Sequence, residues 1–409
     1  MTTNNETDLR QERGRILSLD KRIKLIAGTT WVVPSQSSDS AYLVNTAEAT
    51  CTCPDYELRR HTCKHQYAVT FSRTVETSSD GSQVVTDSIM FSHKTTTERD
   101  WPAYSQAQVE EKETVQKLLR GLCDGLQTPA HPGRGPKPIP MSDAVYAMVL
   151  KVYTTMSARR ASTDIKDSAE SGNMTRAPHY NSVLAAFENP AMTAILTKLI
   201  ERSAAPLASI ETSFAVDSTG FSAAVYRRWF DAKYGREMKQ ATWLKAHAMV
   251  GTTTNVITSV KVTGSDGADC PQLPALVEAT KQTFTMTAVS ADKAYLANEN
   301  LTAIETTGAA PFIPFKCNSQ DDGSPAWRKM RAVFMFKQEE FLAAYGKRNN
   351  IESTFSAVKR KFGHAVRSKT FTAQVNEILC KALCQNLSVL VQAMHRLGIE
   401  PSFLGTVAA

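Results

Sequence analysis

The sequence lacks any apolar run long enough to cross a membrane. None of its 409 residues lies in an uninterrupted apolar stretch of the roughly 18 residues that a bilayer requires. Residues 1–15, MTTNNETDLRQERGR, are polar and have no apolar core of the kind found in a signal peptide. Both absences argue against a membrane protein, and we expect a cytoplasmic protein that makes no contact with a membrane.

Cysteine is also scarce, with eight residues in the whole chain. A reducing cytoplasm keeps thiols from pairing, so we expect metal ligands or buried thiols rather than disulfides. There is no internal repeat. The length predicts two or three domains. A hydrophobic fraction of 42% and a charged fraction of 21% are ordinary for a soluble globular protein.

Four residues of the types that bind metals are concentrated in the short segment CTCPDYELRRHTCKH. Cys51 and Cys53 form a Cys-x-Cys pair, and Cys63 and His65 form a Cys-x-His pair nine residues later. Three thiolates and one imidazole match a closed tetrahedral zinc site of the structural type. His61 is a nearby alternative, but His65 is favoured because its spacing mirrors the first pair. If Cys51 and Cys53 lie on one strand, they share a face.

The chain divides into four regions by composition. Residues 16–75 alternate short β-like runs with the Cys/His cluster, and residues 76–100 are polar and resemble a linker. Residues 101–205 are predicted to be helical. Within them, a helix, a Gly-containing turn and a second amphipathic segment fit a helix-turn-helix DNA reader, and fit equally a helical hairpin that reads nothing. Residues 206–398 switch to strands followed by strand–helix alternation, which predicts an α/β fold with a mixed sheet covered by helices.

In this last region, one acid stands late in an apolar strand and another stands where a strand ends. Asp217 follows the apolar run FAV, and Asp292 follows TAVSA. A carboxylate at such a position is costly unless it is paired, hydrogen-bonded or bound to a metal. Each acid alone fits a cap or a turn. Together with a later glutamate, Glu352, they predict a metal-binding triad.

Glu352 is the one acid in the most basic stretch of the chain, residues 345–369. The net charge of the protein is +7, and this stretch carries most of the excess. Such a concentration is expected of a phosphate-binding surface, although a solvated basic helix gives the same pattern. Its seven cations are Lys347, Arg348, Lys359, Arg360, Lys361, Arg367 and Lys369.

A helix through residues 345–362 separates these cations into two sets. At about 100° per residue, Tyr345, Arg348, Glu352 and Lys359 fall within an arc of about 60°. Arg360 and Lys361 point elsewhere. The apolar stripe that would face the sheet lies beside this arc and consists of Ile351, Phe355, Val358 and Phe362.

The spacing Tyr-x2-Arg-x3-Glu-x6-Lys resembles the YREK signature of bacterial insertion-sequence DDE transposases. Tyr345, Arg348, Glu352 and Lys359 fit it at every position, and FAVDSTGF and SADKAY are similar to the two aspartate motifs of that family. The resemblance covers roughly residues 205–395. The N-terminal cluster resembles a SWIM zinc finger, a module that binds DNA or protein partners.

The resemblance implies a ribonuclease-H-like catalytic fold, preceded by a helical domain and a small zinc-binding domain. It implies that Asp217, Asp292 and Glu352 bind Mg²⁺ or Mn²⁺, and that Tyr345, Arg348 and Lys359 contact DNA near the cleaved end. Zn²⁺ would occupy the finger. The implied partner is double-stranded DNA, both transposon ends and target, bound by a homodimer. Such a protein belongs in a prokaryotic cytoplasm, at the nucleoid when bound to DNA.

The proposed chemistry fits these residue types. Closely packed carboxylates repel one another, and two divalent ions about 3.5–4 Å apart relieve the repulsion while clamping the attacking and leaving oxygens at phosphorus. Water would be the first nucleophile and the freed 3′-OH the second. A regulator derived from a transposase, or a ribonuclease-H-like nuclease that stops after hydrolysis, remain alternatives.

The remaining candidates favour structural roles. Cys380 and Cys384 lie one turn apart in an apolar helix, which fits core thiols better than a second metal site. Trp243 and His247 share a strand face, where packing is favoured over a role beside the metals. A segment at residues 317–341 has no assigned contribution. The acids in loop-like contexts are interpreted as surface residues: Asp231, Asp266, Asp269, Asp321 and Asp322.

Overall fold

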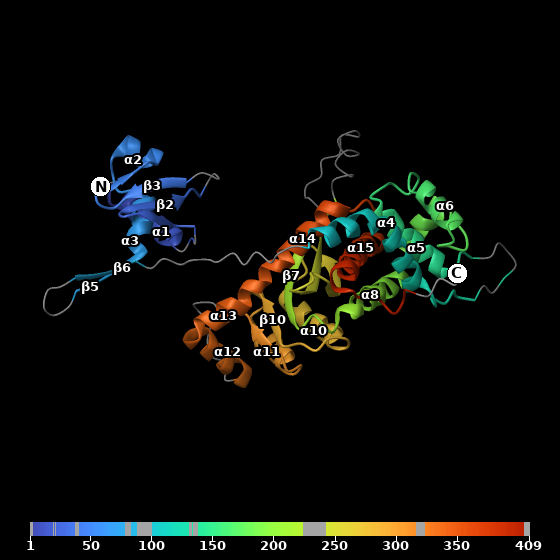
Figure 1. Ribbon diagram of the computed structural model, residues 1–409. Coiled ribbons are helices and arrows are strands. Elements are labelled where there is room, and N and C mark those ends of the chain that lie inside the picture. Colours follow the sequence, from blue (N-terminus) through green and yellow to red (C-terminus); the bar gives the residue numbers. More distant parts are fainter. Residues whose placement is uncertain are drawn as a thin grey trace. The chain divides into compact units, whose positions relative to one another are not determined.

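The computed structural model divides the chain into two compact units, Met1–Glu98 and Arg99–Ala409 (Figure 1). Each unit is described separately. Residues 224–231, where the apolar pattern AVYRRWFD also predicts a strand, lie outside the described residues. The same holds for Asp231, Cys317, Asp321 and Asp322. The structure describes residues 3–18, 20, 22–36, 41–77, 83–87, 100–130, 133, 138–223, 243–315 and 324–404.

The N-terminal unit is a small antiparallel sheet with short helices. Its strands β1 (Lys24–Ala27), β2 (Thr30–Pro34), β3 (Ala41–Asn45) and β4 (Thr50–Cys51) pair in chain order. Two short helices follow, α2 (Pro54–Arg59) and α3 (Lys64–Phe71). The core centres on the buried side chains of Trp31, Val33 and Val44.

A helix that the sequence reading did not predict, α1 (Thr3–Leu17), packs against α3. Gly14 permits this close approach, because a Cβ there would lie 2.4 Å from the Cβ of Tyr67. A two-stranded ribbon follows the finger, β5 (Arg73–Thr77) paired with β6 (Gln83–Asp87). The ribbon extends into the segment that the composition assigned to a linker, and residues 88–99 lie outside the described residues.

The second unit begins with five helices. They are α4 (Trp101–Cys123), α5 (Met141–Tyr153), α6 (Ser162–Glu170), α7 (Tyr180–Glu188) and α8 (Ala191–Ala204). The connection between α6 and α7 spans residues 171–179, which is longer than the three- or four-residue turn of a helix-turn-helix. DNA reading by this pair stays a prediction.

A five-stranded mixed sheet forms the centre of the second unit, as the strand pattern predicted (Figure 1). The order is β11-β10-β7-β8-β9, from β7 (Ser213–Ser222), β8 (Trp243–Gly251), β9 (Ile257–Gly264), β10 (Ala288–Ala291) and β11 (Ala310–Phe312). Strand β8 pairs antiparallel with both β7 and β9. Strand β10 runs parallel to β7, and β11 runs parallel to β10. Helices α10 (Leu273–Lys281) and α11 (Asn298–Glu305) connect the parallel strands. The arrangement is consistent with a ribonuclease-H-like fold.

Four helices complete the unit: α12 (Pro325–Phe336), α13 (Gln338–Tyr345), α14 (Asn349–Phe362) and α15 (Phe371–Leu397). Helix α15 is buried over most of its length and packs against α8, α4 and α5, so the helical region and the sheet share one core. Cys380 and Cys384 are fully buried in that core, as favoured from the sequence. The segment without an assigned contribution forms α12 and the beginning of α13.

Among the described helices, none is by itself long and apolar enough to cross a bilayer. One pair reaches that length and composition jointly, Tyr180–Glu188 with Ala191–Leu207, but it is bent by 89°. Its buried side chains belong to the core of the second unit.

Candidate metal centre and active site

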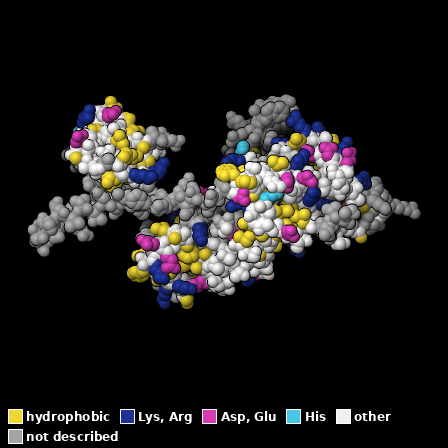
Figure 2. All heavy atoms as spheres, viewed as in Figure 1, with side chains coloured by type: hydrophobic (Ala, Val, Ile, Leu, Met, Phe, Trp, Pro, Cys, Tyr) yellow, Lys and Arg dark blue, Asp and Glu magenta, His cyan; other side chains and the backbone are white. Residues whose placement is uncertain are grey.

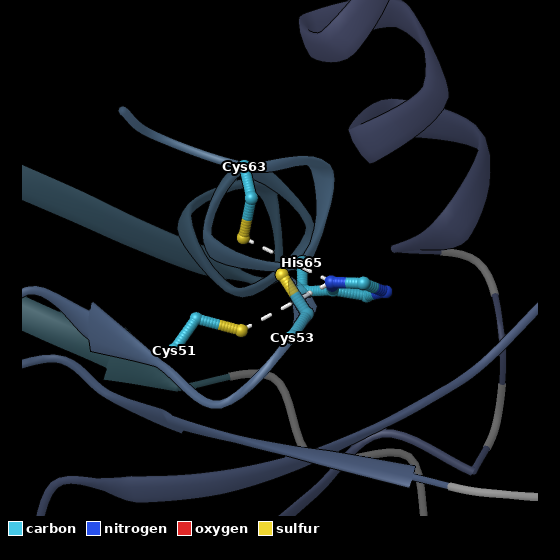
Figure 3. A group of neighbouring side chains, drawn as sticks. All are labelled: Cys51, Cys53, Cys63 and His65. Carbon is cyan, nitrogen blue, oxygen red and sulfur yellow. Dashed lines mark hydrogen bonds between the residues drawn. The ribbon is translucent and has the colours of Figure 1, made fainter. Parts of the chain in front are cut away.

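The four predicted zinc ligands converge in the N-terminal unit, and Figure 3 shows their side chains turned toward one another. All four ligand atoms lie within 4.8 Å of one another. The Nδ1 atom of His65 is 3.8 Å from the Cys63 sulfur and 4.0 Å from the Cys51 sulfur. Tetrahedral zinc with bonds of about 2.0–2.3 Å separates its ligands by nearly 4 Å, so the cluster fits a zinc ion. His61 is exposed, so His65 is the fourth ligand of the cluster.

Local backbone structure places each ligand. Cys51 ends β4, whereas Cys53 and Cys63 are the N-cap residues of α2 and α3. The two thiols of the Cys-x-Cys pair therefore do not share a strand. Gln66 accepts a hydrogen bond from the Cys63 amide at 2.9 Å and donates one to the carbonyl of Ala49 at 2.6 Å. This side chain joins the two ligand pairs, and nothing in the spacing of the cysteines pointed to it.

The cluster is buried, and its thiols interact strongly. The hydrogen bond with the Cys51 thiol, and to a lesser extent that with His65, lowers the pKa of Cys63 to about 4. The same pairing raises the pKa of Cys51 above its ordinary value. His65 leaves its other ring nitrogen, Nε2, buried without a hydrogen-bond partner. A thiolate and a correctly presented imidazole nitrogen are the donors that zinc prefers.

In the second unit, strand register brings the first two acids together. Ala291 pairs with Val216 across the parallel strands β10 and β7. The next residue on each strand is therefore Asp292 and Asp217, side by side. Asp292 accepts a hydrogen bond from the Lys293 amide at 2.6 Å and begins a short 3-10 turn. Asp217 accepts one from the Ser218 amide at 2.8 Å.

Glu352 reaches this edge from α14, which packs on β7. Two side chains fasten the helix to the loop between β8 and β9. Asn350 donates to the Thr252 carbonyl at 2.6 Å, and Thr354 donates to the Asn255 side chain at 3.3 Å. The fully buried Glu211 holds the same loop by accepting from the backbone amides of residues 253 and 254. Asn350, a residue type that disfavours helix interiors, thus anchors the helix that carries Glu352.

Arg348 bridges two of the three acids. Its guanidinium donates to Asp217 at 2.6 Å and to Glu352 at 2.8 Å. The Arg348 side chain is 14% exposed and that of Asp217 22%, whereas Glu352 is 60% exposed. A cation therefore already lies between two carboxylates that arrive from different elements. The sequence placed Arg348 on the stripe of Glu352 but did not predict this ion pair.

The charges at this edge shift the pKa of Asp217. Burial is the largest cause and raises that pKa above its ordinary value, and the negative charges of Asp292 and Glu352 raise it further. The Ser218 amide and Arg348 act in the opposite direction. The negative charges of both other acids thus act on Asp217, which places the three carboxylates in one electrostatic site.

The expected helix through residues 345–362 is interrupted. A 3-10 turn at Gly346–Arg348 separates α13 from α14, so Tyr345 ends one helix while Glu352 lies on the next. Arg348 still lies over the Tyr345 ring, 5.8 Å from its centroid. Burial raises the pKa of Tyr345 above its ordinary value. The predicted neighbours thus remain together despite the break.

Lys359 lies farther along α14, with its ammonium 5.6 Å from the ring centroid of Phe221 on β7. Burial lowers the pKa of Lys359 below its ordinary value. Lys361, on the other side of the helix, pairs with Glu111 at 3.3 Å. The division of the basic residues into two sets is therefore present in the structure.

Three polar residues near the acids were missed or differ from expectation. The side chain of Asp269, interpreted as a surface acid, contacts His247 at 3.2 Å and Lys245 at 3.1 Å. His247 is fully buried and also contacts the Thr263 hydroxyl at 2.9 Å, so it belongs to this packed pair. Tyr295, buried beside Asp269 and Asp217, has its pKa raised mainly by burial. These contacts join segments that are distant in sequence, so no local sequence pattern predicts them.

The acid site fits a hard divalent cation by its donors. It offers carboxylate oxygens and no thiol or imidazole ligand, which is the set that Mg²⁺ and Mn²⁺ take. The guanidinium of Arg348 lies between Asp217 and Glu352, so this position already holds a positive charge. Among the described residues, only the Cys/His cluster brings three or more such ligand atoms close enough for one ion without rearrangement. Arg348 would have to move for the acids to share an ion.

Comparison with known families agrees with both sites. Residues 209–387 match the family model of the transposase DDE domain, and residues 34–73 match that of the SWIM zinc finger. No curated protein and no solved structure gives a significant match. The first match contains all three acids and the YREK residues, and the second contains the four zinc ligands. The chain therefore carries a transposase DDE domain preceded by a SWIM zinc finger, as the motifs predicted.

Proposed function

We propose that this chain, a SWIM finger joined to a transposase DDE domain, cleaves DNA at transposon ends and transfers the cut strand into target DNA. The observation that carries the proposal is the convergence of Asp217, Asp292 and Glu352 at one sheet edge, within the segment that matches a transposase domain. The three acids come from two neighbouring strands and a helix. An edge of this kind is open to a large substrate, as the exposure of Glu352 indicates.

In this proposal the three acids hold divalent cations, Mg²⁺ or Mn²⁺. Such ions activate water as a nucleophile and stabilise negative charge on the oxygens around phosphorus. The acids must be ionised to bind them, although burial and mutual repulsion oppose this. Arg348 supports the ionised state of Asp217 by contributing a positive charge at 2.6 Å. No residue of the chain needs to form a covalent intermediate.

Arg348, Tyr345 and Lys359 would position the DNA. A guanidinium binds phosphate with two parallel hydrogen bonds, so Arg348 can exchange its carboxylate partners for a phosphate when substrate and metal arrive. Tyr345 holds the arginine from one side through its ring. Lys359 contributes a partly desolvated charge farther along α14. On the face shown in Figure 2, basic and acidic side chains are interspersed.

The zinc finger has a separate role in this scheme. Zinc bound by Cys51, Cys53, Cys63 and His65 would hold the N-terminal unit folded, because the four ligands fill a tetrahedral shell and leave no open position for chemistry. The finger would then contact DNA or a protein partner. Cleaving two ends and joining them to one target favours a homodimer in the DNA complex, acting at the nucleoid of a prokaryotic cytoplasm.

The test uses the full chain and DNA fragments that carry the terminal repeats found beside its gene. We expect strand cleavage that requires Mg²⁺ or Mn²⁺, followed by joining of the cut ends to a target plasmid. Asp217→Asn should reduce cleavage by about a thousandfold, since it removes a metal ligand. End binding and thermal stability should change little.

Asp266→Asn is the matched control, because Asp266 is exposed and lies outside the site. Loss of end binding by the Asp217 variant, with folding preserved, would contradict the catalytic assignment. Cleavage without joining would identify a nuclease, and binding without cleavage by the unmodified chain would identify a regulator.

A further inference from the structure

A second positively charged site lies apart from the three acids, in a pocket of about 130 Å³. Its walls come from α5, from the segment that follows α14, and from α15. None of its lining residues belongs to the acid site or to the YREK set. The ionisable residues among them are Lys151, His364, Arg367, Glu377 and Lys381.

Lys151 on α5 is the unusual member. It is 5% exposed, yet its ammonium has no hydrogen bond or ion pair with any residue that the structure describes. The ammonium lies 5.0 Å from the centroid of the Phe187 ring. Buried lysines are rare without a partner, because removing the charge from water is costly. The pocket supplies the direction in which a partner could approach.

Lys381 on α15 adds a second buried ammonium. It is 1% exposed and donates to the carbonyls of Gly363 at 2.7 Å and Ala365 at 2.8 Å. An ammonium has three donors, so one remains for a ligand. Burial lowers the pKa of Lys381 to about 8, which leaves it mostly protonated at neutral pH.

The one acid of the pocket is already engaged. Glu377 accepts from the amides of Arg367 at 3.1 Å and Ser368 at 2.9 Å, and from the Ser368 hydroxyl at 2.7 Å. Burial opposes its ionisation, but Lys151, Ser368 and the Arg367 amide outweigh this and keep the pKa of Glu377 below its ordinary value. Its charge balances one of the two buried lysines. The guanidinium side chain of Arg367 adds further positive charge to the lining.

We propose that this pocket binds a phosphate group. A pocket of about 130 Å³ has room for one tetrahedral oxyanion. The two buried ammonium groups of Lys151 and Lys381 offer N–H donors to an oxyanion, and Arg367 adds positive charge to the lining. Free inorganic phosphate and a phosphate of the DNA backbone share this chemistry.

The position of the pocket makes DNA a source to test. The ammonium of Lys381 lies 5.4 Å from the ring centroid of Phe221, a residue of the strand that carries Asp217. Four residues of a strand span about 13 Å. A duplex that reaches the acids is therefore long enough to present a phosphate here as well. The site itself does not depend on the acids or on metal.

The experiment titrates the full chain with inorganic phosphate and, separately, with sodium chloride at matched ionic strength, by calorimetry and thermal shift. We expect saturable binding and a raised Tm with phosphate only. Lys151→Met keeps the apolar stem and removes the charge, and it should weaken phosphate binding at least tenfold. Arg367→Gln, a surface change that disturbs folding less, should weaken it severalfold.

Lys112→Met is the matched control, since Lys112 is an exposed lysine that pairs with Asp164; it should bind phosphate as the unmodified chain does. Equal responses to phosphate and chloride, or unchanged binding in the folded Lys151 variant, would overturn the proposal. In a competition arm, phosphate that weakens duplex binding in the unmodified chain but not in Lys151→Met identifies DNA as the source. Binding of phosphate without such competition identifies the free ion. Neither readout requires cleavage, so failure here is distinct from failure of the transposase proposal.

Discussion

The finger and the acid site place their ligands by opposite means. The four predicted zinc ligands lie between Cys51 and His65, on one strand end, two helix caps and the first turn of α3. The acids come from β7, from the end of β10 and from α14, and only the sheet register and the helix anchors bring them together. Thiol ligands converge in a buried, closed set, whereas the carboxylates remain partly exposed with an arginine between them.

Under the proposed function, this difference corresponds to two uses of metal in one chain. A closed set of soft ligands contributes to folding and offers no position to a substrate. A partly open set of hard ligands contributes little to folding and leaves room for DNA. Metal removal should therefore have structural consequences in the first unit and chemical consequences in the second.

The largest expected effect is loss of the finger. Structural zinc contributes about 10–16 kcal/mol to folding in isolated fingers, so Cys63→Ser or strong chelation should unfold the N-terminal unit. The second unit, with its own core, should remain folded. Limited proteolysis with mass spectrometry measures both. Cys270→Ser is the control, since Cys270 lies outside the zinc cluster. If the N-terminal unit stays protected from proteolysis without zinc, the finger does not depend on metal for folding. The contrast between a structural and a chemical metal site would then be wrong.

A smaller effect is expected at the acid site when its arginine is removed. Arg348→Met should reduce cleavage by about a hundredfold, a loss comparable to removing one preorganised donor. Because Arg348 lowers the pKa of Asp217, its removal should raise that pKa. The ionised acid is the active form, so the acidic limb of the pH–rate profile should move to higher pH.

The Arg348 variant should retain its fold, which circular dichroism can verify. Arg202→Met provides a control, because Arg202 contacts the Leu122 carbonyl at 3.3 Å, away from the acids. An unchanged acidic limb, or one displaced to lower pH, would mean that Arg348 does not govern the ionisation of Asp217.

The smallest effect is expected at Lys359. Lys359→Met should weaken DNA binding by about tenfold and reduce the slope of log K against log salt by roughly one, as expected for one phosphate contact. Lys361→Met serves as the control, because Lys361 already pairs with Glu111. Equal losses in the two variants would show that α14 contributes general charge rather than one specific contact.

Much of this arrangement follows from local patterns in the sequence. Strand β8 and helix α15 lie in the region 206–398, where strands and helices were predicted, because an apolar run and a long amphipathic pattern define them. The zinc ligands were predictable for a related reason. Their spacing is local, and few other roles explain three cysteines and a histidine at such short intervals.

Features that depend on distant contacts were not predictable. Helix α1 is polar along most of its length, and Gly14 allows α3 to approach it closely. The break at Gly346–Arg348 accompanies the contact of Arg348 with Asp217, a residue far away in the sequence. The pocket lined by Lys151 and Lys381 likewise combines residues of α5 and α15, which no sequence motif connects. Periodicity identifies elements and faces, but it does not state which charged groups meet.

The central claim is that Asp217 binds the catalytic metal directly, and Asp217→Cys tests it. Cleavage of transposon-end DNA by this variant should be lost in Mg²⁺ and recover at least in part in Mn²⁺, because a thiolate is a softer ligand that Mn²⁺ accepts more readily than Mg²⁺. The unmodified chain and Asp266→Cys should cleave in both. Normal cleavage by Asp217→Cys in Mg²⁺, or an equal loss in both ions, would contradict a direct metal contact by Asp217.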